Sequence, residues 1–440
     1  MNAAQRALAR VPLPQGAIVV GVGLVISGLS QYGFLSVASH ALGKALYAPL
    51  STFWALLFVM APGFFLPLEQ EVGRALAARR TRGEGGRPLV IRAAVAGGSL
   101  AFVLVLATGL ASGVLTTRLF DGDGAFVWAL AIGFAVYALQ FLTRGTLAGN
   151  GRFAPYGSLL ALEGVARVVF GVALGLAAVH VAGAYGLVLV FGSFVAVVLV
   201  AAGRTGLLKP GPPAAWSELS NALGFLLVAS VMTQFLLSIG TVAVKLLASP
   251  SEETAPGQFL SSRIVAYVPI FLFQAVQAAL LPKLSALAAK GHHVEFRRTL
   301  VQLLLLVAAL GVVATIGLAL LGPFITKTLF GSGLELGRVD FLLLAASCSV
   351  FMIAQVLSQT LIALSGYAQV AAGWVSGGAA FVVVTALGSS LFLRVELGLL
   401  VGSIATVAVM TILLLPLMRS RAATHEGVEL VASATPVPEI

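Results

Sequence analysis

Long, uninterrupted apolar runs separated by short polar connections make up most of this chain. A run of about 20 apolar residues is long enough for a helix to cross the hydrocarbon core of a bilayer. Inside a bilayer the backbone must satisfy its own hydrogen bonds, so spanning segments are helices or closed barrels. Barrel strands alternate polar and apolar residues over about 10 positions, whereas these runs are continuous and longer. The pattern therefore predicts an all-α polytopic membrane protein.

The number of runs predicts about twelve transmembrane helices. Charged residues make up only 10% of the chain, against roughly 25% in soluble domains, so a water-facing surface could not be covered. We expect spans at 16–37, 46–68, 91–115, 125–143, 155–179, 183–203, 220–247, 258–281, 299–321, 340–364, 369–391 and 396–417.

The basic residues predict an orientation. With the N-terminus in the cytoplasm, 18 of the 26 Lys and Arg residues lie on the cytoplasmic side and 6 on the outer side, while Arg167 and Arg263 remain within spans. This asymmetry follows the positive-inside rule. We expect a multi-pass membrane protein with both termini in the cytoplasm. The net charge of +10 then indicates contact with anionic membrane lipids and no nucleic acid.

Two landmarks recur at one spacing and predict an internal repeat. Pro67 and Pro282 lie at the ends of the second and eighth spans, and Gly151 and Gly366 lie in the turns after the fourth and tenth; each pair is 215 positions apart. Paired bundles around a central cavity are a common plan for transporters. We predict two six-helix lobes around such a cavity, with an N-terminal lobe at 1–203, a cytoplasmic linker at 204–219, a C-terminal lobe at 220–417 and a disordered cytoplasmic tail at 418–440.

The sequence favours transport over catalysis. No connection is long enough to form a soluble domain, and no phosphate-binding loop of the G-x-x-x-x-G-K-[ST] type occurs. The single cysteine, Cys348, excludes a disulfide framework and a cysteine-based metal site. We expect no catalytic residues, no metal and no cofactor.

Arg263 is the first candidate binding residue, because ionisable groups inside a bilayer usually face a cavity or the interior of a bundle. It lies near the start of the eighth span. Its guanidinium either faces a cavity, where it could bind phosphate with two hydrogen bonds, or extends along lipid towards the interface.

Glu163 and Arg167 are the second candidate, because their spacing of four places them on one face of the fifth span. They form either a structural ion pair or a coupling pair, in which protonation of Glu163 frees Arg167 for an anion such as pyrophosphate. Glutamines within spans are candidates for lining the cavity or for bonding helices together; they are Gln234, Gln274, Gln277, Gln355 and Gln359.

Two segments carry a resemblance to a known superfamily. Residues 260–269 read Leu-Ser-Ser-Arg-Ile-Val-Ala-Tyr-Val-Pro, and 280–285 read Leu-Leu-Pro-Lys-Leu-Ser. Residues 144–153 read Arg-Gly-Thr-Leu-Ala-Gly-Asn-Gly-Arg-Phe. They resemble the eighth helix and the turn after the fourth helix in the multidrug/oligosaccharidyl-lipid/polysaccharide (MOP) exporter superfamily, in particular bacterial polysaccharide flippases, which are related to the lipid II flippases.

The resemblance implies a flippase for a polyprenyl-pyrophosphate-linked oligosaccharide, which works by alternating access and is driven by an ion gradient or the membrane potential. It implies that Arg263 faces the cavity, and it makes a polysaccharide polymerase or glycosyltransferases candidate partners. No basic residue lies between Arg10 and Lys44, and only twelve spans are found, which favours a surface-polysaccharide unit over a lipid II substrate. Residues 239–241 read Ile-Gly-Thr where polysaccharide flippases often carry an acidic residue. The alternatives are a multidrug or other small-molecule exporter of the same architecture and a membrane-embedded polyprenyl-linked glycosyltransferase or ligase.

Overall fold

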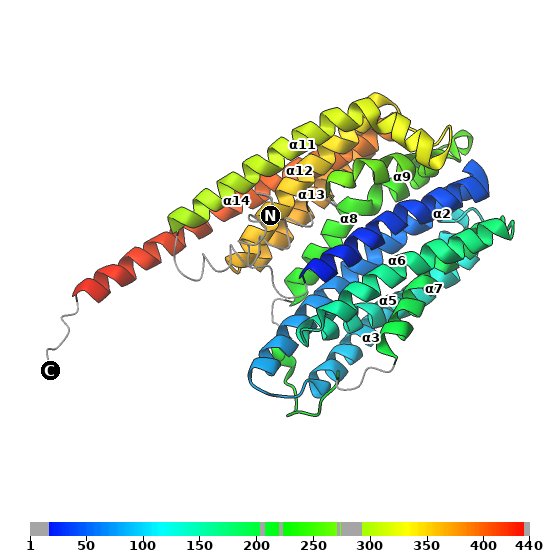
Figure 1. The fold of residues 1–440 in the computed structure, drawn as a ribbon. Helices are drawn as coiled ribbons and strands as arrows, with labels where there is room; N and C mark the ends of the chain where they lie inside the picture. Colours follow the sequence, from blue (N-terminus) through cyan, green and yellow to red (C-terminus); the bar gives the residue numbers. More distant parts are fainter. Residues whose placement is uncertain (1–16, 203–206, 220–222, 271–272, 274–292, 435–440) are drawn as a thin grey trace, which may run out of the picture. The chain divides into compact units, whose positions relative to one another are not determined.

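The computed structural model describes residues 17–202, 207–219, 223–270, 273 and 293–434, and within these ranges it contains helices and no strand. Ten of the described helices are long and apolar enough to cross a membrane. The chain divides into two compact units, Met1–Leu223 and Gly224–Ile440. The ten helices in Figure 1 are α2 (Ala17–Thr81), α3 (Arg87–Leu110), α5 (Ala125–Gly149), α6 (Phe153–Leu176), α7 (Ala182–Ala201), α8 (Leu223–Leu247), α11 (His293–Phe330), α12 (Arg338–Ala363), α13 (Tyr367–Leu387) and α14 (Leu391–Ala434).

Helix α2 contains the first two predicted spans. Its 65 residues are interrupted at Gly43, where φ is 67° and ψ is 175°, a conformation that favours glycine. The break separates the two apolar runs without a polar loop. The eighth predicted span, 258–281, begins in the short helix α9 (Ala255–Ala266), and most of its second half lies outside the described residues.

The end of α2 corrects one detail of the sequence analysis. The stretch after Pro67 was expected to be part of a long connection, but the helix continues to Thr81. Along this extension the apolar residues Leu68, Val72 and Leu76 recur every fourth position and bury against α3. The amphipathic pattern therefore keeps the segment helical, and residues 82–86 alone connect α2 to α3.

The last helix corrects a second detail. A disordered tail was predicted from residue 418, whereas α14 continues as a helix to Ala434. The sequence from 418 to 434 contains no proline and only one glycine, and most of its residues are compatible with a helix.

Small residues set the helix spacing inside each unit. A Cβ atom on Gly23 of α2 would lie 2.4 Å from the carbonyl oxygen of Gly157 on α6. In the second unit, a Cβ atom on Gly377 of α13 would lie 2.7 Å from the carbonyl oxygen of Gly402 on α14. Such close approach is typical of helices that pack within lipid, where small residues let backbones meet.

Candidate functional site

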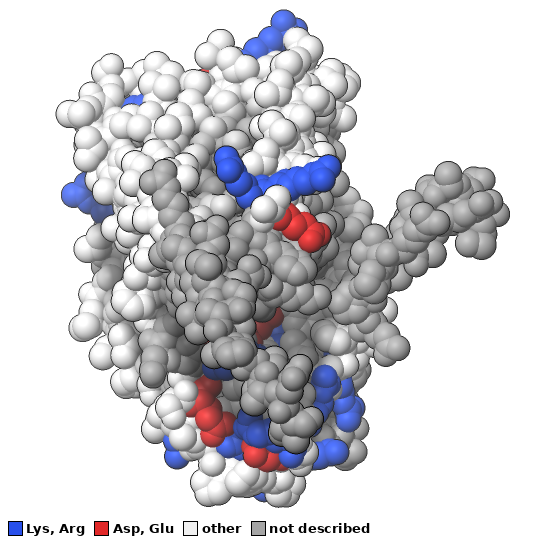
Figure 2. Space-filling model, turned by 90° about the vertical axis from the view of Figure 1, so that its left-hand side faces the viewer, with Lys and Arg blue, Asp and Glu red and all other residues white. Residues whose placement is uncertain are grey.

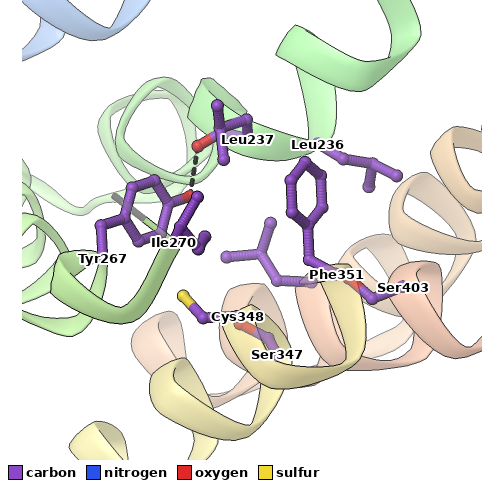
Figure 3. A pocket seen from close by; sticks show the side chains of 9 residues that line it. Leu236, Leu237, Tyr267, Ile270, Ser347, Cys348, Phe351 and Ser403 are labelled. Carbon is purple, nitrogen blue, oxygen red and sulfur yellow. Dashed lines mark hydrogen bonds between the residues drawn. The ribbon is translucent and has the colours of Figure 1, made fainter. Parts of the chain in front are cut away.

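Arg263 is buried inside the C-terminal unit. It lies on α9, and only 1% of its surface is exposed. Its Nε donates a hydrogen bond to the hydroxyl of Tyr267 at 2.6 Å, Nη2 donates to the same oxygen, and the guanidinium carbon lies 4.6 Å from the centre of the Tyr267 ring. The Tyr267 hydroxyl in turn donates to the backbone carbonyl of Leu237 on α8 (Figure 3). Arg263 is therefore enclosed by protein, and Tyr267 connects it to the neighbouring helix.

A small pocket lies beside this group. Side chains from α8, α12 and α14 and from the residues after α9 line it (Figure 3); they are Leu236, Leu237, Tyr267, Ile270, Ser347, Cys348, Phe351, Leu399 and Ser403. Arg263 lies close enough to Cys348 for the guanidinium to interact electrostatically with the thiol. The pocket thus combines apolar walls with a few hydroxyl groups near a cation.

The Arg263 guanidinium lacks a complete set of partners. Among the described residues, its buried Nη1 has no hydrogen-bond partner, and Arg263 takes part in none of the ion pairs that they form. A buried cation without a carboxylate is costly in a protein interior. This arrangement can accept an anion.

The structure describes three of the five glutamine candidates. Gln355 and Gln359 are half-buried on α12 and share one face, and Gln234 is half-buried on α8. Gln274 and Gln277 lie outside the described residues. None of the three described glutamines lines the pocket beside Arg263.

Glu163 and Arg167 form an ion pair at the centre of the N-terminal unit. The side chains of Glu163 and Arg167 are almost fully buried. Gln140 of α5 donates from Nε2 to Glu163 at 2.6 Å, and Ser193 of α7 donates to the other Glu163 oxygen at 2.9 Å. Arg167 donates from Nη2 to the hydroxyls of Tyr137 and Ser193, each at 3.0 Å. The cluster therefore joins three helices through a compensated pair of charges.

The sequence analysis missed the partners of this cluster and a second one. Glu69 of α2 pairs with Arg144 of α5 at 3.0 Å, and the hydroxyl of Tyr156 on α6 donates to Glu69 at 2.7 Å. Sequence distance conceals these contacts, because Glu69 and Tyr156 are 87 positions apart. The only signal available was that Gln140 is a polar residue inside an apolar run.

Glu396 is a third missed residue. It lies in the second turn of α14, is fully buried, and neither of its carboxylate oxygens has a hydrogen-bond partner among the described residues. The sequence placed it at the first residue of the last span, where a carboxylate would be expected to reach water. The structure instead encloses it within the C-terminal unit.

Charged side chains of both signs gather at the lower end of the face in Figure 2, the end at which Figure 1 shows the turn between α2 and α3. Here Arg79, only 2% exposed, donates from Nε and Nη2 to the carboxylate of Glu218 at 2.7 and 2.8 Å. This bidentate hydrogen bond, together with a hydrogen bond from the backbone amide of Ala215, lowers the pKa of Glu218 to about 2. Residues 207–219, which we name the linker segment, are thereby fixed to the N-terminal unit.

No protein family model matches the chain. An uncharacterized protein of Mycobacterium tuberculosis is 24% identical over 430 residues, which cover 90% of this chain and 91% of that protein. An uncharacterized protein of Mycobacterium bovis is 25% identical over 409 residues, which cover 89% of this chain and 90% of that protein.

Solved structures match over almost the whole length. A multidrug resistance MATE family transporter of the MOP superfamily, in its inward-facing conformation, superposes with a TM-score of 0.72 at 13% identity and covers 93% of this chain and 99% of its own. The outward-facing conformation of such a transporter superposes with a TM-score of 0.68 at 11% identity and covers 94% of this chain and 95% of its own. The Vibrio cholerae MATE transporter VcmN, in its bent form, superposes with a TM-score of 0.62 at 15% identity and covers 93% of this chain and 97% of its own. The chain therefore has the all-α, two-lobed fold of these transporters, which confirms the predicted fold class of a multi-pass membrane protein.

Proposed function

We propose that this chain is an exporter of the bacterial inner membrane that moves a polyprenyl-pyrophosphate-linked oligosaccharide from the cytoplasmic to the outer leaflet by alternating access. The fold shared with MATE transporters supports export, and the basic loops support cytoplasmic termini. The anionic substrate is supported by one observation, the buried guanidinium of Arg263, whose Nη1 has no hydrogen-bond partner within the described part of the chain.

In this proposal Arg263 binds the pyrophosphate of the carrier. A guanidinium can hold two phosphate oxygens at once, and its charge makes each hydrogen bond stronger than one between neutral groups. Tyr267 occupies Nε and one N–H group of Nη2, so a bidentate phosphate can bind the edge of the guanidinium formed by Nη1 and the other N–H group of Nη2.

An ion gradient or the membrane potential supplies the driving force. Moving one charge through 100 mV changes the free energy by about 2.3 kcal/mol, and outward movement of an anion is downhill when the inside is negative. Glu163 is the coupling candidate and Arg167 a second ligand for pyrophosphate, once protonation of Glu163 releases it. The half-buried Gln234, Gln355 and Gln359 are proposed to contact sugar.

The test uses purified protein in liposomes with a fluorescent polyprenyl-pyrophosphate-linked sugar. Arg263→Ala removes hydrogen bonds to a charged group, worth about 1.5–3 kcal/mol each, so flipping should slow by at least ~10-fold. Arg338→Ala is the matched control, because Arg338 is exposed at the start of α12. Flipping by Arg263→Ala at the wild-type rate would exclude Arg263 from the site.

A second function is favoured by a different observation. Glu396 is a buried carboxyl group, which suits a cationic drug, and the solved structures of this fold include multidrug transporters. The same liposomes can test this function. Multidrug export would be supported if a cationic dye is exported only when Glu396 is present and the lipid-linked sugar is not flipped. The lipid-linked substrate would be supported if flipping of the lipid-linked sugar requires Arg263 and is not inhibited by the dye.

A further inference from the structure

The linker segment brings a basic and aromatic surface to the start of α3. The backbone amide of Arg87, the first residue of α3, donates to the carbonyl of Lys209 at 3.0 Å. Further along the linker segment, the ring centre of Trp216 lies 5.4 Å from the guanidinium carbon of Arg92 on α3. Arg87, Lys209 and Trp216 are exposed, and Arg92 is half-buried. One edge of the N-terminal unit therefore presents three cations and an indole ring.

Close backbone contacts hold the linker segment against the helices at this edge. A Cβ atom on Gly85 would lie 1.7 Å from the carbonyl oxygen of Pro210, and one on Gly211 would lie 2.1 Å from the carbonyl oxygen of Gly85. Further along, Ala214 and Leu219 are buried in an apolar cluster with side chains of α2 and α3. The backbone that carries the cations and the indole is thus already ordered, which lowers the entropy cost of binding a ligand there.

The carboxylates at this end of the N-terminal unit are already paired with other arginines. They are Glu69, Glu71, Glu84 and Glu218, whose partners are Arg144, Arg74, Arg82 and Arg79. Asp121 and Asp123 lie beyond the opposite end of α3. Arg87, Arg92 and Lys209 take part in none of the ion pairs that the described residues form. The edge therefore carries positive charge that suits an anion from outside the chain.

The face of α3 that begins at Arg87 continues as an apolar stripe. Positions 87, 91, 95 and 102 follow one side of the helix, and Ile91, Val95 and Phe102 are each more than half exposed. In the orientation that the basic residues predict, the start of α3 lies on the cytoplasmic side. Tryptophan rings favour the level of the lipid headgroups. A lipid of the cytoplasmic leaflet whose acyl chains lie along this stripe therefore brings its phosphate to the level of Arg87 and Trp216.

We propose that this edge is a binding site for an anionic phospholipid of the cytoplasmic leaflet, whose phosphate is held by Arg87, Arg92 and Lys209 beside the ring of Trp216. Guanidinium groups match phosphate oxygens in geometry and charge, and the contact with the indole ring orients Arg92. A zwitterionic lipid binds less well, because its own ammonium group adds a fourth cation. The site belongs to the N-terminal unit alone and does not depend on the proposed export function.

Quenching of Trp216 fluorescence by brominated lipid tests this site in the purified full-length protein. The protein is placed in phosphatidylcholine nanodiscs that contain a small fraction of brominated phosphatidylglycerol or of brominated phosphatidylcholine. The chain has four tryptophans, so the difference between the wild type and Trp216→Phe isolates the signal of Trp216. Brominated phosphatidylglycerol should quench this signal at a lower lipid fraction than brominated phosphatidylcholine, and added salt should reduce the preference because salt screens exposed charges.

Matched variants show which charges create the preference. One cation near an anionic headgroup contributes a factor of about five in affinity, so Arg87→Gln should lower the preference about fivefold. Arg118→Gln is the control, because Arg118 is exposed beyond the opposite end of α3, and it should keep the preference. Equal quenching of the wild type by the two brominated lipids, or an equal loss of preference in both variants, would overturn the site. Loss of the preference in millimolar inorganic phosphate at constant ionic strength would assign the cations to a soluble anion and would also overturn the lipid site.

Discussion

Replacing Arg79 by alanine should release the linker segment from the N-terminal unit. All five N–H groups of this guanidinium are used: two bind Glu218, and the others bind the backbone carbonyls of Gly85, Pro212 and Pro213 at 3.0–3.3 Å. Breaking a buried ion pair costs about 3–5 kcal/mol. Because 26% of the Glu218 side chain is exposed and can regain water, we place the cost at the lower end, at about 3 kcal/mol.

Hydrogen exchange measured by mass spectrometry reports this opening locally. A loss of about 3 kcal/mol corresponds to a ~150-fold faster exchange, because 1.4 kcal/mol is a factor of ten. The informative amides are those of Glu218 and Leu219, which donate to backbone carbonyls within the linker segment. Arg80→Ala is the control, since the neighbouring Arg80 is exposed and should change exchange little. Unchanged exchange in Arg79→Ala, or equal acceleration in Arg80→Ala, would refute the argument.

Three further changes test other parts of the structure. Because the pKa of Glu218 is lowered, its carboxylate stabilises the linker segment above pH ~4.5, and this contribution is lost as the pH falls towards about 2. A nitroxide attached to the linker segment should therefore become mobile over that pH interval in electron paramagnetic resonance. Constant mobility of the nitroxide would contradict this prediction. Gly23→Ala should lower the melting temperature through an overpacking cost of about 1–3 kcal/mol. Gly21→Ala should not lower it, because a Cβ atom on Gly21 would meet nothing within 4 Å. Equal melting temperatures of the two variants would disprove the close approach of α2 and α6 at Gly23. Arg167→Leu should destabilise the N-terminal unit by about 3–5 kcal/mol, and the added Glu163→Gln should recover part of that loss in thermal unfolding, since it removes the carboxylate left unpaired; additive losses would argue against the ion pair.

Hydropathy and charge alone determined the spans and the class of the protein. The break at Gly43 does not change the predicted architecture, because a run of apolar residues indicates membrane insertion even where its helix is interrupted. The spacing of four between Glu163 and Arg167 also predicted their contact correctly, since residues four apart on a helix are neighbours.

The tertiary structure decided which distant residues meet. Arg79 finds Glu218 139 positions away, Gln140 reaches Glu163 from another helix, and Arg263 is enclosed by Tyr267 rather than exposed to lipid. The sequence could not predict these contacts, because lipid is as apolar as the helix interior and the spans carry no polar face to mark which side turns inward. The rotation of each helix about its axis decides which side chains meet, and close glycine contacts such as Gly23–Gly157 fix the packing of the helices.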